Sequence, residues 1–255
     1  MQTYSHIECL GYPIFSDKLE RVKVENKILV STINQYSYCI AEKDEEFKNA
    51  LMNSDILLPD GIGIISASKF LNRKVMPKIA GADIHEFLLK KLDQEGGSCF
   101  YLGASETTLE KITVRISQEY PNIKVCTYSP PFKPSFSEID SEAMIGAVND
   151  FQPDVLFVGM TAPKQEKWAY AYKENLNAKW ICSIGAVFDF YAGTIERPSE
   201  IWINLGMEWL GRLIKEPRRM AKRYIYYGAV FTYYLTLEKY KLFFQQKQKN
   251  PTTTE

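Results

Sequence analysis

The stretch that decides the predicted fold is Asp154-Val155-Leu156-Phe157-Val158-Gly159-Met160-Thr161-Ala162-Pro163-Lys164-Gln165-Glu166-Lys167-Trp168. Its apolar run, Val155 to Val158, is typical of a strand buried on both faces of a parallel sheet. Gly159 ends that strand, and Pro163 fits the first turn of a helix, where a missing N–H costs nothing. Lys164 to Glu166 should then lie near free backbone donors. This arrangement predicts a site for an anionic or polar ligand at the carboxyl edge of the sheet. The alternative is an ordinary strand-to-helix connection with solvated charges.

The rest of the chain continues the alternation of strands and helices. Further strands are expected at 28–34, 55–58, 99–102, 123–128 and 180–184, and apolar residues at helical spacing lie between them. This order predicts an α/β domain of Rossmann-like type, with a mostly parallel sheet and helices on both faces. The glycine and polar residues that follow successive strands should cluster along one edge of the sheet.

Composition limits the class of protein. The chain has 255 residues, enough for one large domain or for one domain with an appendage. It carries 31 basic and 31 acidic side chains, which argues against a general binder of nucleic acid or another polyanion. The first residues lack the basic-then-apolar pattern of a secretory signal, so we expect a cytosolic protein.

Several known sites are not indicated by any motif. The five cysteines are widely spread without C-x-x-C spacing, so we interpret them as buried, reduced thiols and expect no zinc site and no disulfides. There is no G-x-G-x-x-G turn, phosphate-binding P-loop, G-x-S-x-G or H-E-x-x-H, and the missing glycine turn argues against a nicotinamide oxidoreductase. No Asp-x-Asp pair offers two carboxylates to a metal–diphosphate complex. If a nucleoside diphosphate is the leaving group, helix dipoles and cations must stabilise it.

The character of the sequence changes after Pro198. A helix containing Trp202 and Trp209 is expected to stop at Glu216, because the following proline disfavours helical geometry. A further helix can begin at Pro217 with Arg218, Arg219, Lys222 and Arg223 in its first turns. Cations there oppose the helix dipole, which suggests that they serve an external anion.

An uncharged aromatic run at 224–235 follows these cations. It is too short and too rich in tyrosine to span a bilayer, which needs about 20 apolar residues. Two interpretations stay open: a helix lying in the headgroup layer of a membrane, or a terminal helix that packs on the domain or on another subunit. We therefore predict an α/β catalytic domain at 1–197, a helical basic and aromatic appendage at 198–245, and a disordered tail at 246–255.

Polar residues at the predicted strand ends are the candidates for chemistry. Asp60 lies between Pro59 and Gly61, where it can act as a general base or, more simply, cap a helix or form an Asp-Gly turn. Thr32 and Asn34 can hydrogen-bond a ligand, although both residue types also end strands. Asp189, between two phenylalanines, is either a partnered structural carboxylate or part of the same site.

Seven ordered segments between about residues 32 and 224 carry a resemblance to a known family: Thr32-Ile33-Asn34, Leu58-Pro59-Asp60-Gly61-Ile62-Gly63, Ala80-Gly81-Ala82-Asp83, Pro163-Lys164-Gln165-Glu166-Lys167-Trp168, Phe188-Asp189-Phe190-Tyr191-Ala192-Gly193, Gly206-Met207-Glu208-Trp209-Leu210 and Arg212-Leu213-Ile214-Lys215-Glu216-Pro217. They resemble the WecG/TagA/CpsF glycosyltransferase family. The resemblance implies an inverting hexosyltransferase that moves a sugar, often N-acetylmannosamine or its uronic acid, from a UDP donor to a polyprenyl-diphosphate-linked sugar. It also implies a Rossmann-like domain with a C-terminal appendage that meets the membrane and covers the active site.

The resemblance assigns roles residue by residue. It implies that Asp60 is the base that deprotonates the acceptor hydroxyl. Thr32, Asn34 and Gln165 match positions that hold donor or acceptor. Lys78 stands where many members have arginine, which keeps the charge that would stabilise the departing UDP but loses the fork of the guanidinium. The remaining substrate-binding candidates are Gly159, Asp189, Arg197 and the arginines implied to grip the lipid diphosphate, Arg212, Arg219 and Arg223.

Two departures from the family pattern bear on sugar selectivity. Thr161 replaces a small residue after Gly159, and Gln35-Tyr36 replace the more familiar Pro-His after Asn34. We predict a cytosolic enzyme on the inner face of the cytoplasmic membrane that acts without metal or cofactor in the synthesis of a cell-surface polysaccharide of teichoic-acid type, and that can form a homo-oligomer. The alternative is a non-catalytic module that binds a nucleotide sugar or a partner and docks through its aromatic C-terminal helix.

Overall fold

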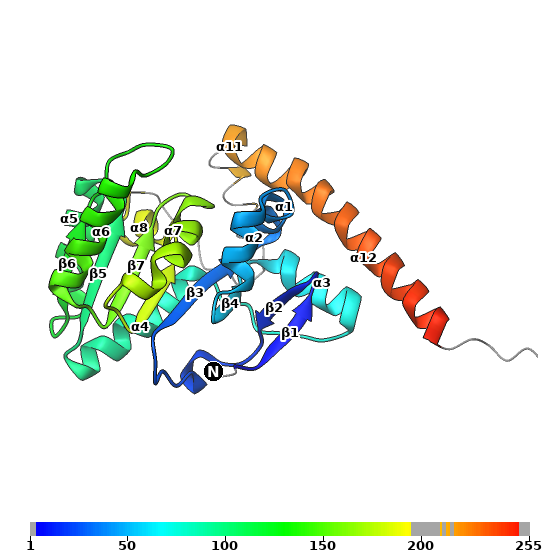
Figure 1. Ribbon diagram of the computed structural model, residues 1–255, viewed down its shortest axis with the longest axis horizontal. Coiled ribbons are helices and arrows are strands. Elements are labelled where there is room, and N and C mark those ends of the chain that lie inside the picture. The colour runs from blue at the N-terminus through cyan, green and yellow to red at the C-terminus, as the bar shows by residue number, and fades with distance from the viewer. Residues whose placement is uncertain (1–3, 195–209, 211–212, 215–216, 250–255) are drawn as a thin grey trace, which may run out of the picture.

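The computed structural model describes residues 4–194, 210, 213–214 and 217–249, and its centre is a six-stranded parallel sheet (Figure 1). The strand order is β4-β3-β8-β7-β5-β6. The strands are β3 (Ile28–Ile33), β4 (Ile56–Pro59), β5 (Ser98–Gly103), β6 (Lys124–Tyr128), β7 (Val155–Gly159) and β8 (Trp180–Ser183). Each lies where the sequence predicts a strand. The predicted α/β fold with a parallel sheet is therefore confirmed.

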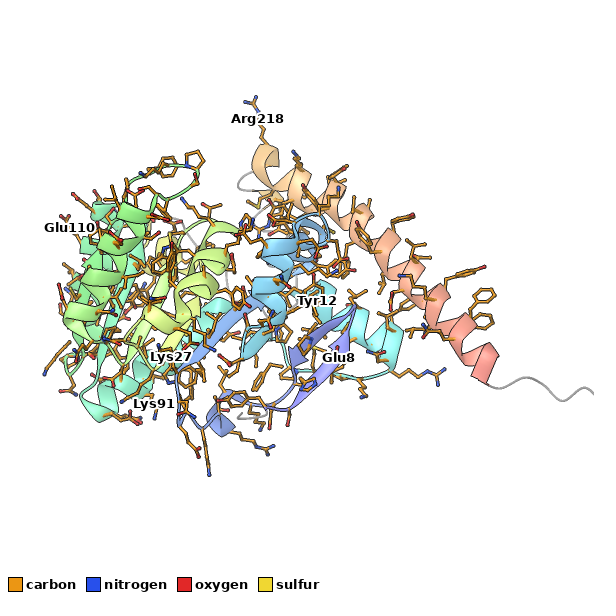
Figure 2. The ribbon with its side chains drawn as sticks, in the orientation of Figure 1. Glu8, Tyr12, Lys27, Lys91, Glu110 and Arg218 are labelled. Carbon is orange, nitrogen blue, oxygen red and sulfur yellow. The ribbon has the colours of Figure 1, made fainter. Side chains whose placement is uncertain are left out.

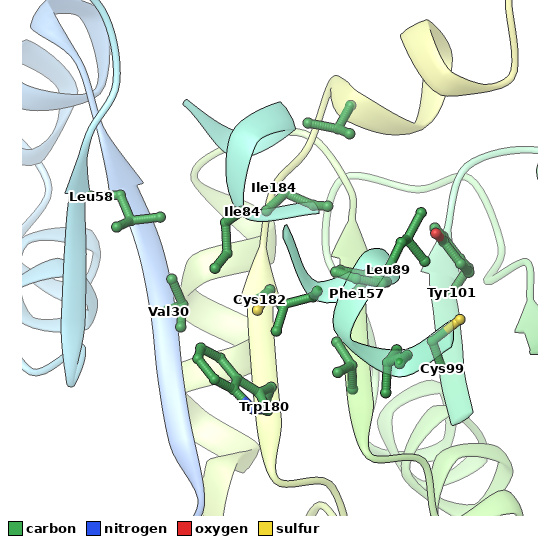
Figure 3. Close-up of a cluster of buried hydrophobic side chains, with 14 of the residues drawn as sticks. Val30, Leu58, Ile84, Leu89, Cys99, Tyr101, Phe157, Trp180, Cys182 and Ile184 are labelled. Carbon is green, nitrogen blue, oxygen red and sulfur yellow. The ribbon is translucent and has the colours of Figure 1, made fainter. Parts of the chain in front are cut away.

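Alternate residues of the central strands pack into separate clusters on the two faces of the sheet. Val30, Phe157 and Cys182 face one layer of helices, which contains α4 (Gly81–Glu95), α5 (Glu106–Glu119) and α8 (Val187–Tyr191) (Figure 3). Their neighbours Leu29, Leu156 and Ile181 face α6 (Glu138–Phe151) and α7 (Lys164–Tyr172). Because helices cover both faces of the sheet, the central strands consist mainly of consecutive apolar residues.

A third cluster lies beside the β4 edge of the sheet. It joins α1 (Gln35–Ala41), α2 (Glu45–Met52) and α3 (Ile62–Asn72) to an antiparallel hairpin of β1 (His6–Cys9) and β2 (Tyr12–Phe15). Tyr12 projects from this hairpin into the cluster (Figure 2). The sequence did not predict the hairpin, nor α1 as a helix separate from α2. Two short 3-10 helices, Leu19–Arg21 and Lys173–Asn175, complete the elements of the first 194 residues.

The C-terminal helices return to this third cluster. Helix α11 (Pro217–Ala221) begins at the predicted proline and continues through a π-helical segment (Lys222–Tyr226) into α12 (Tyr227–Lys249). α12 ends four residues later than we predicted, so 246–249 belong to it and not to a disordered tail. Most of the predicted helix with Trp202 and Trp209 lies outside the described residues.

One side of α12 packs on the domain. Phe231 is buried in the third cluster, and its ring meets Tyr38 edge-on with the centroids 5.5 Å apart. The opposite side exposes large side chains such as Tyr233, Tyr240 and Phe243. Packing of the terminal helix on the domain is thus confirmed, while membrane contact stays a prediction. Among the described residues, no helix combines the length and the apolar character needed to cross a bilayer.

Candidate active site

A cavity of about 1340 Å³ opens at the carboxyl edge of the sheet. The beginnings of α1, α4, α5, α7 and α8 surround it, as expected where parallel strands pass into helices. Its lining contains seven of the residues proposed from the sequence: Thr32, Asn34, Asp60, Gly159, Gln165, Asp189 and Arg223. The predicted clustering of strand-end residues is therefore confirmed.

The structure does not bring every candidate to this cavity. Lys78 lines a separate hollow of about 540 Å³, together with Asp17 and Arg21. Arg197 and Arg212 lie outside the described residues, as does the side chain of Arg219, whose backbone belongs to α11.

Asp60 follows β4 directly and is half-buried at the cavity. Its backbone N–H donates to the carbonyl of Ile33 at 2.9 Å, which extends the pairing of β4 with β3 by one residue. Gly61, with φ of +90°, occupies the N-cap position of α3. The N-cap position of α3 therefore belongs to Gly61 and not to Asp60, and Asp60 lines the cavity.

Asn34 has a structural role that was not predicted from the sequence, where only the ending of a strand was considered for it. Its Oδ1 accepts hydrogen bonds from the backbone N–H groups of Tyr36 at 3.0 Å and Ser37 at 3.1 Å, which caps α1. Its Nδ2 makes no hydrogen bond within the described part of the chain. Asn34 can therefore serve a ligand as a donor while its oxygen holds the helix. Thr32, half-buried at the end of β3, lines the same wall.

Gly159 is required by close packing at the end of β7. A Cβ added there would lie 2.4 Å from the ring of Phe188, far inside van der Waals contact. The glycine thereby lets α8 approach the strand end and brings Asp189, in the first turn of α8, to the cavity. Thr194 donates its hydroxyl to the backbone carbonyl of Asp189 at 3.0 Å and its N–H to the same oxygen at 3.0 Å.

The first turn of α7 adds two buried polar side chains, Gln165 and Glu166. Gln165 Oε1 accepts from the backbone N–H of Met160 at 3.1 Å, and its Nε2 donates to Glu166 Oε1 at 2.8 Å. Burial raises the pKa of Glu166 to about 7. The sequence singled out Gln165 but missed Glu166, because glutamate in a first turn is normally solvated. Nothing in the local pattern signals that this one is only 2% exposed.

The C-terminal helices supply the wall beside α1. The guanidinium of Arg223 lies over the ring of Tyr36, with its Cζ 4.7 Å from the centroid, and the ring of Tyr227 meets Tyr36 edge-on at 4.9 Å. Met220 and Lys222 complete this wall. Tyr36, one of the departures from the family pattern, therefore positions a cation of the appendage at the cavity.

The opposite wall comes from the loop between β6 and α6. Pro130, Pro131 and Phe132 line the cavity there, and Phe132 is fully exposed. Lys164 of α7 donates to the carbonyl of Lys133 at 2.8 Å, which ties this loop to the start of α7. The sequence marked the loop by its prolines but gave it no role at the site.

The electrostatics of the cavity suit a ligand that carries both phosphate and hydroxyl groups. The positive ends of α4, α5 and α7 point toward it, and Lys164, Lys222 and Arg223 add cationic charge. Asp60 and Asp189 supply carboxylates that can accept hydrogen bonds or a proton. Such a site can hold a diphosphate and place a base beside it.

Comparison with known proteins identifies the family. The sequence model of the glycosyl transferase WecG/TagA/CpsF family matches residues 5–245. The chain belongs to this family. It is therefore a glycosyltransferase, and the WecG/TagA/CpsF assignment decides against a non-catalytic binding module.

Curated relatives of the chain carry one shared name. A Bacillus subtilis (strain 168) protein is 30% identical over 241 residues, which cover 94% of this chain and 88% of that protein. A Bacillus spizizenii protein is 27% identical over 71% of this chain and 69% of its own length, and a Staphylococcus aureus (strain MW2) protein is 24% identical over 77% and 76%. Each is named N-acetylglucosaminyldiphosphoundecaprenol N-acetyl-beta-D-mannosaminyltransferase.

Proposed function

We propose that this WecG/TagA/CpsF enzyme transfers N-acetylmannosamine, or a closely related sugar, from a UDP donor to N-acetylglucosamine linked to polyprenyl diphosphate. The shared name of the relatives supports the sugar and the acceptor. The observation that carries the proposal is the half-buried Asp60 in a cavity surrounded by helix N-termini. The product enters a cell-surface polysaccharide of teichoic-acid type.

Asp60 acts as the general base in a single displacement. The hydroxyl oxygen of the acceptor forms a bond to the anomeric carbon while its proton passes to the Asp60 carboxylate. The bond from the anomeric carbon to the phosphate oxygen breaks, and its electron pair leaves with UDP. One displacement inverts the anomeric centre, so an α-linked donor gives a β-linked product. A carboxylate ionised at neutral pH and within hydrogen-bond reach of the hydroxyl meets the requirement for such a base.

Helix dipoles and protein cations stabilise the departing diphosphate without a metal. The N-terminus of α5 at Ser105 and that of α7 at Lys164 both open on the cavity, and backbone N–H groups at such termini bind phosphate oxygens. Asn34 Nδ2 and Gln165 Nε2 are additional donors toward the sugar nucleotide. Thr32 and Asp189 accept hydrogen bonds from its hydroxyl groups.

The appendage brings the lipid-linked acceptor to the cavity. Arg223, held over Tyr36, grips the lipid diphosphate as a planar fork of donors, together with Arg212 and Arg219, and Arg197 is a further substrate-binding residue. The exposed aromatic side of α12, with Tyr233 and Tyr240, rests in the headgroup layer at the inner face of the cytoplasmic membrane. The same exposed aromatic side chains can bind a second copy of the chain, which would form a homo-oligomer.

The decisive experiment offers the enzyme a panel of UDP-sugars and a short-chain lipid-diphosphate N-acetylglucosamine, and identifies products by mass. We expect N-acetylmannosamine to be transferred, with equal turnover in the presence of a chelator. Asp60→Asn should lower turnover at least about 100-fold while binding of the UDP-sugar is retained. Unchanged turnover in Asp60→Asn, or no transfer from any UDP-sugar, contradicts the proposal.

A second experiment tests the acceptor site. Arg223→Lys keeps the charge but loses the fork, so KM for the lipid acceptor should rise about tenfold with KM for the donor unchanged. Arg73→Lys, an exposed arginine at the end of α3, is the matched control and should alter neither constant. Equal acceptor KM values in the two variants would remove Arg223 from the proposed grip.

A further inference from the structure

Glu166 is a buried carboxyl group that the proposed chemistry does not use. It lines the cavity, yet its side chain is only 2% exposed. Its Oε1 accepts the hydrogen bond from Gln165, and its Oε2 has no hydrogen-bond partner in the described part of the chain. A buried polar atom without a partner costs about 1–3 kcal/mol, and more when the group is charged. Because the unpartnered Oε2 lowers the stability of the fold, the presence of Glu166 needs an explanation other than stability.

Neighbouring cations do not supply that reason. Lys167, the next residue along α7, is engaged on the protein surface by Asp44 at 2.7 Å and Glu46 at 3.0 Å. Lys164 reaches away to the carbonyl of Lys133. Glu166 is therefore not one half of a buried ion pair within the described residues. Apart from its own backbone N–H, the hydrogen-bond partner of the carboxyl group among the described residues is the Gln165 amide, and Oε1 can accept from that amide in either protonation form.

The amide of Gln165 is held in one orientation by its two neighbours. The backbone N–H of Met160 can only donate, so the oxygen of the amide must face it. The amide nitrogen must then face Glu166. Gly185, with φ of +51°, packs against the same amide, and a Cβ there would lie 3.1 Å from Nε2. Of the two N–H groups on Nε2, one is used by Glu166, and within the described residues the other stays available at the wall of the cavity.

We propose that Glu166 is a positioning residue that fixes the Gln165 amide as a hydrogen-bond donor to an oxygen of the bound sugar nucleotide. This inference rests on the proposed function and adds to it a residue that does not itself touch the substrate. Without Glu166 the amide nitrogen loses its anchor and the side chain gains rotational freedom, so the donor is no longer held where charge develops as the glycosidic bond breaks.

A purely structural role for Glu166 predicts a different result. A carboxylate that stabilises the fold should lower stability when it is removed. A positioning carboxylate that is buried without a full set of partners should raise stability when an apolar side chain of similar volume replaces it, while turnover falls. Glu166→Met tests this difference because methionine is unbranched and fills a similar space.

The experiment measures kcat and KM for donor and acceptor together with thermal unfolding in five variants: Glu166→Met, Glu166→Gln, Ser183→Ala, Gln165→Ala and the double variant Gln165→Ala/Glu166→Met. Glu166→Met should lower kcat about 10- to 100-fold, with donor KM within about threefold and a Tm no lower than that of the unchanged protein. Glu166→Gln keeps an oxygen for the Gln165 amide and should retain kcat within about threefold. Ser183→Ala is the control, because the Ser183 hydroxyl is the other buried side-chain group without a partner among the described residues and lies outside the cavity lining; it should leave kcat unchanged. In a Gln165→Ala background, Glu166→Met should cause no further loss of kcat.

The outcomes separate this inference from the proposed function. Full kcat in Glu166→Met, or an additional loss in the Gln165→Ala background, overturns the positioning role while sugar transfer by the unchanged protein stands. Failure of the unchanged protein to transfer any sugar overturns the proposed function. The orientation of Gln165 is then still tested by its side-chain amide signals in a ¹⁵N–¹H spectrum. Two resolved hydrogens, of which the one bonded to residue 166 is protected from exchange, support the anchor if they persist in Glu166→Gln and are lost in Glu166→Met, and signals unaffected by Glu166→Met overturn it.

Discussion

Replacing Glu166 by glutamine should change how the stability of the protein depends on pH. Burial raises the pKa of this carboxyl group to about 7 from its ordinary value of 4.5. Between these two values the folded chain binds a proton that the unfolded chain has released, so its stability falls as pH rises through this window. At 1.36 kcal/mol per pKa unit, the full effect is about 3 kcal/mol, and most of it falls between pH 5 and pH 8. Glutamine does not titrate and removes this contribution.

The assay is urea unfolding followed by tryptophan fluorescence at pH 5 and pH 8 for both proteins. Relative to the variant, the unchanged protein should lose about 2–3 kcal/mol of unfolding free energy between pH 5 and pH 8. His85 also affects stability in this range: burial lowers the pKa of the folded imidazole to about 3, while the unfolded one binds a proton near pH 6.5, so the folded state loses stability as pH falls below 6.5. His85 is present in both proteins, so its contribution cancels in the difference. A difference that stays constant within about 0.5 kcal/mol from pH 5 to pH 8 would refute the assignment of a buried, uncompensated carboxyl group.

Two further changes test the packing around the cavity. Gly159→Ala drives a methyl group into the ring of Phe188 and should lower the free energy of unfolding by about 1–3 kcal/mol. At the control position Gly146 an added Cβ meets nothing within 4 Å, so Gly146→Ala should leave this free energy unchanged or raise it by up to about 1 kcal/mol. Equal unfolding midpoints for the two variants would contradict the close approach of α8. Phe231→Ala removes the buried aromatic contact of α12 and should cost about 3–5 kcal/mol in urea unfolding, against less than about 0.5 kcal/mol for the exposed Tyr233→Ala. Similar losses in those two variants would mean that α12 does not pack on the domain through this face.

Local pattern was sufficient to predict the sheet and the edge where chemistry takes place. Runs such as Val155 to Val158 alternate with helical spacing, and parallel strands joined by helices necessarily bring their carboxyl ends to one edge. Thr32 lies at the carboxyl end of β3, Asp60 follows β4 and Gln165 lies in the first turn of the helix after β7, so the alternation of strands and helices brings all three to the cavity. The hairpin β1–β2 and helix α1 escaped prediction because they are short, and short elements contain too few periods to stand out.

Only the tertiary structure decided the contacts that join distant parts of the chain. Arg223 meets Tyr36 because α12 packs back on α1 and α3, an arrangement that depends on burial of Phe231 and not on local spacing. Lys78, close in sequence to the cavity residues Ala80 and Gly81, lines another hollow. Glu166 reads as an ordinary first-turn glutamate, and its raised pKa arises from desolvation by surrounding elements. Strand and helix periods are properties of neighbours in sequence, whereas burial, cation–π contact and pKa are set by neighbours in space.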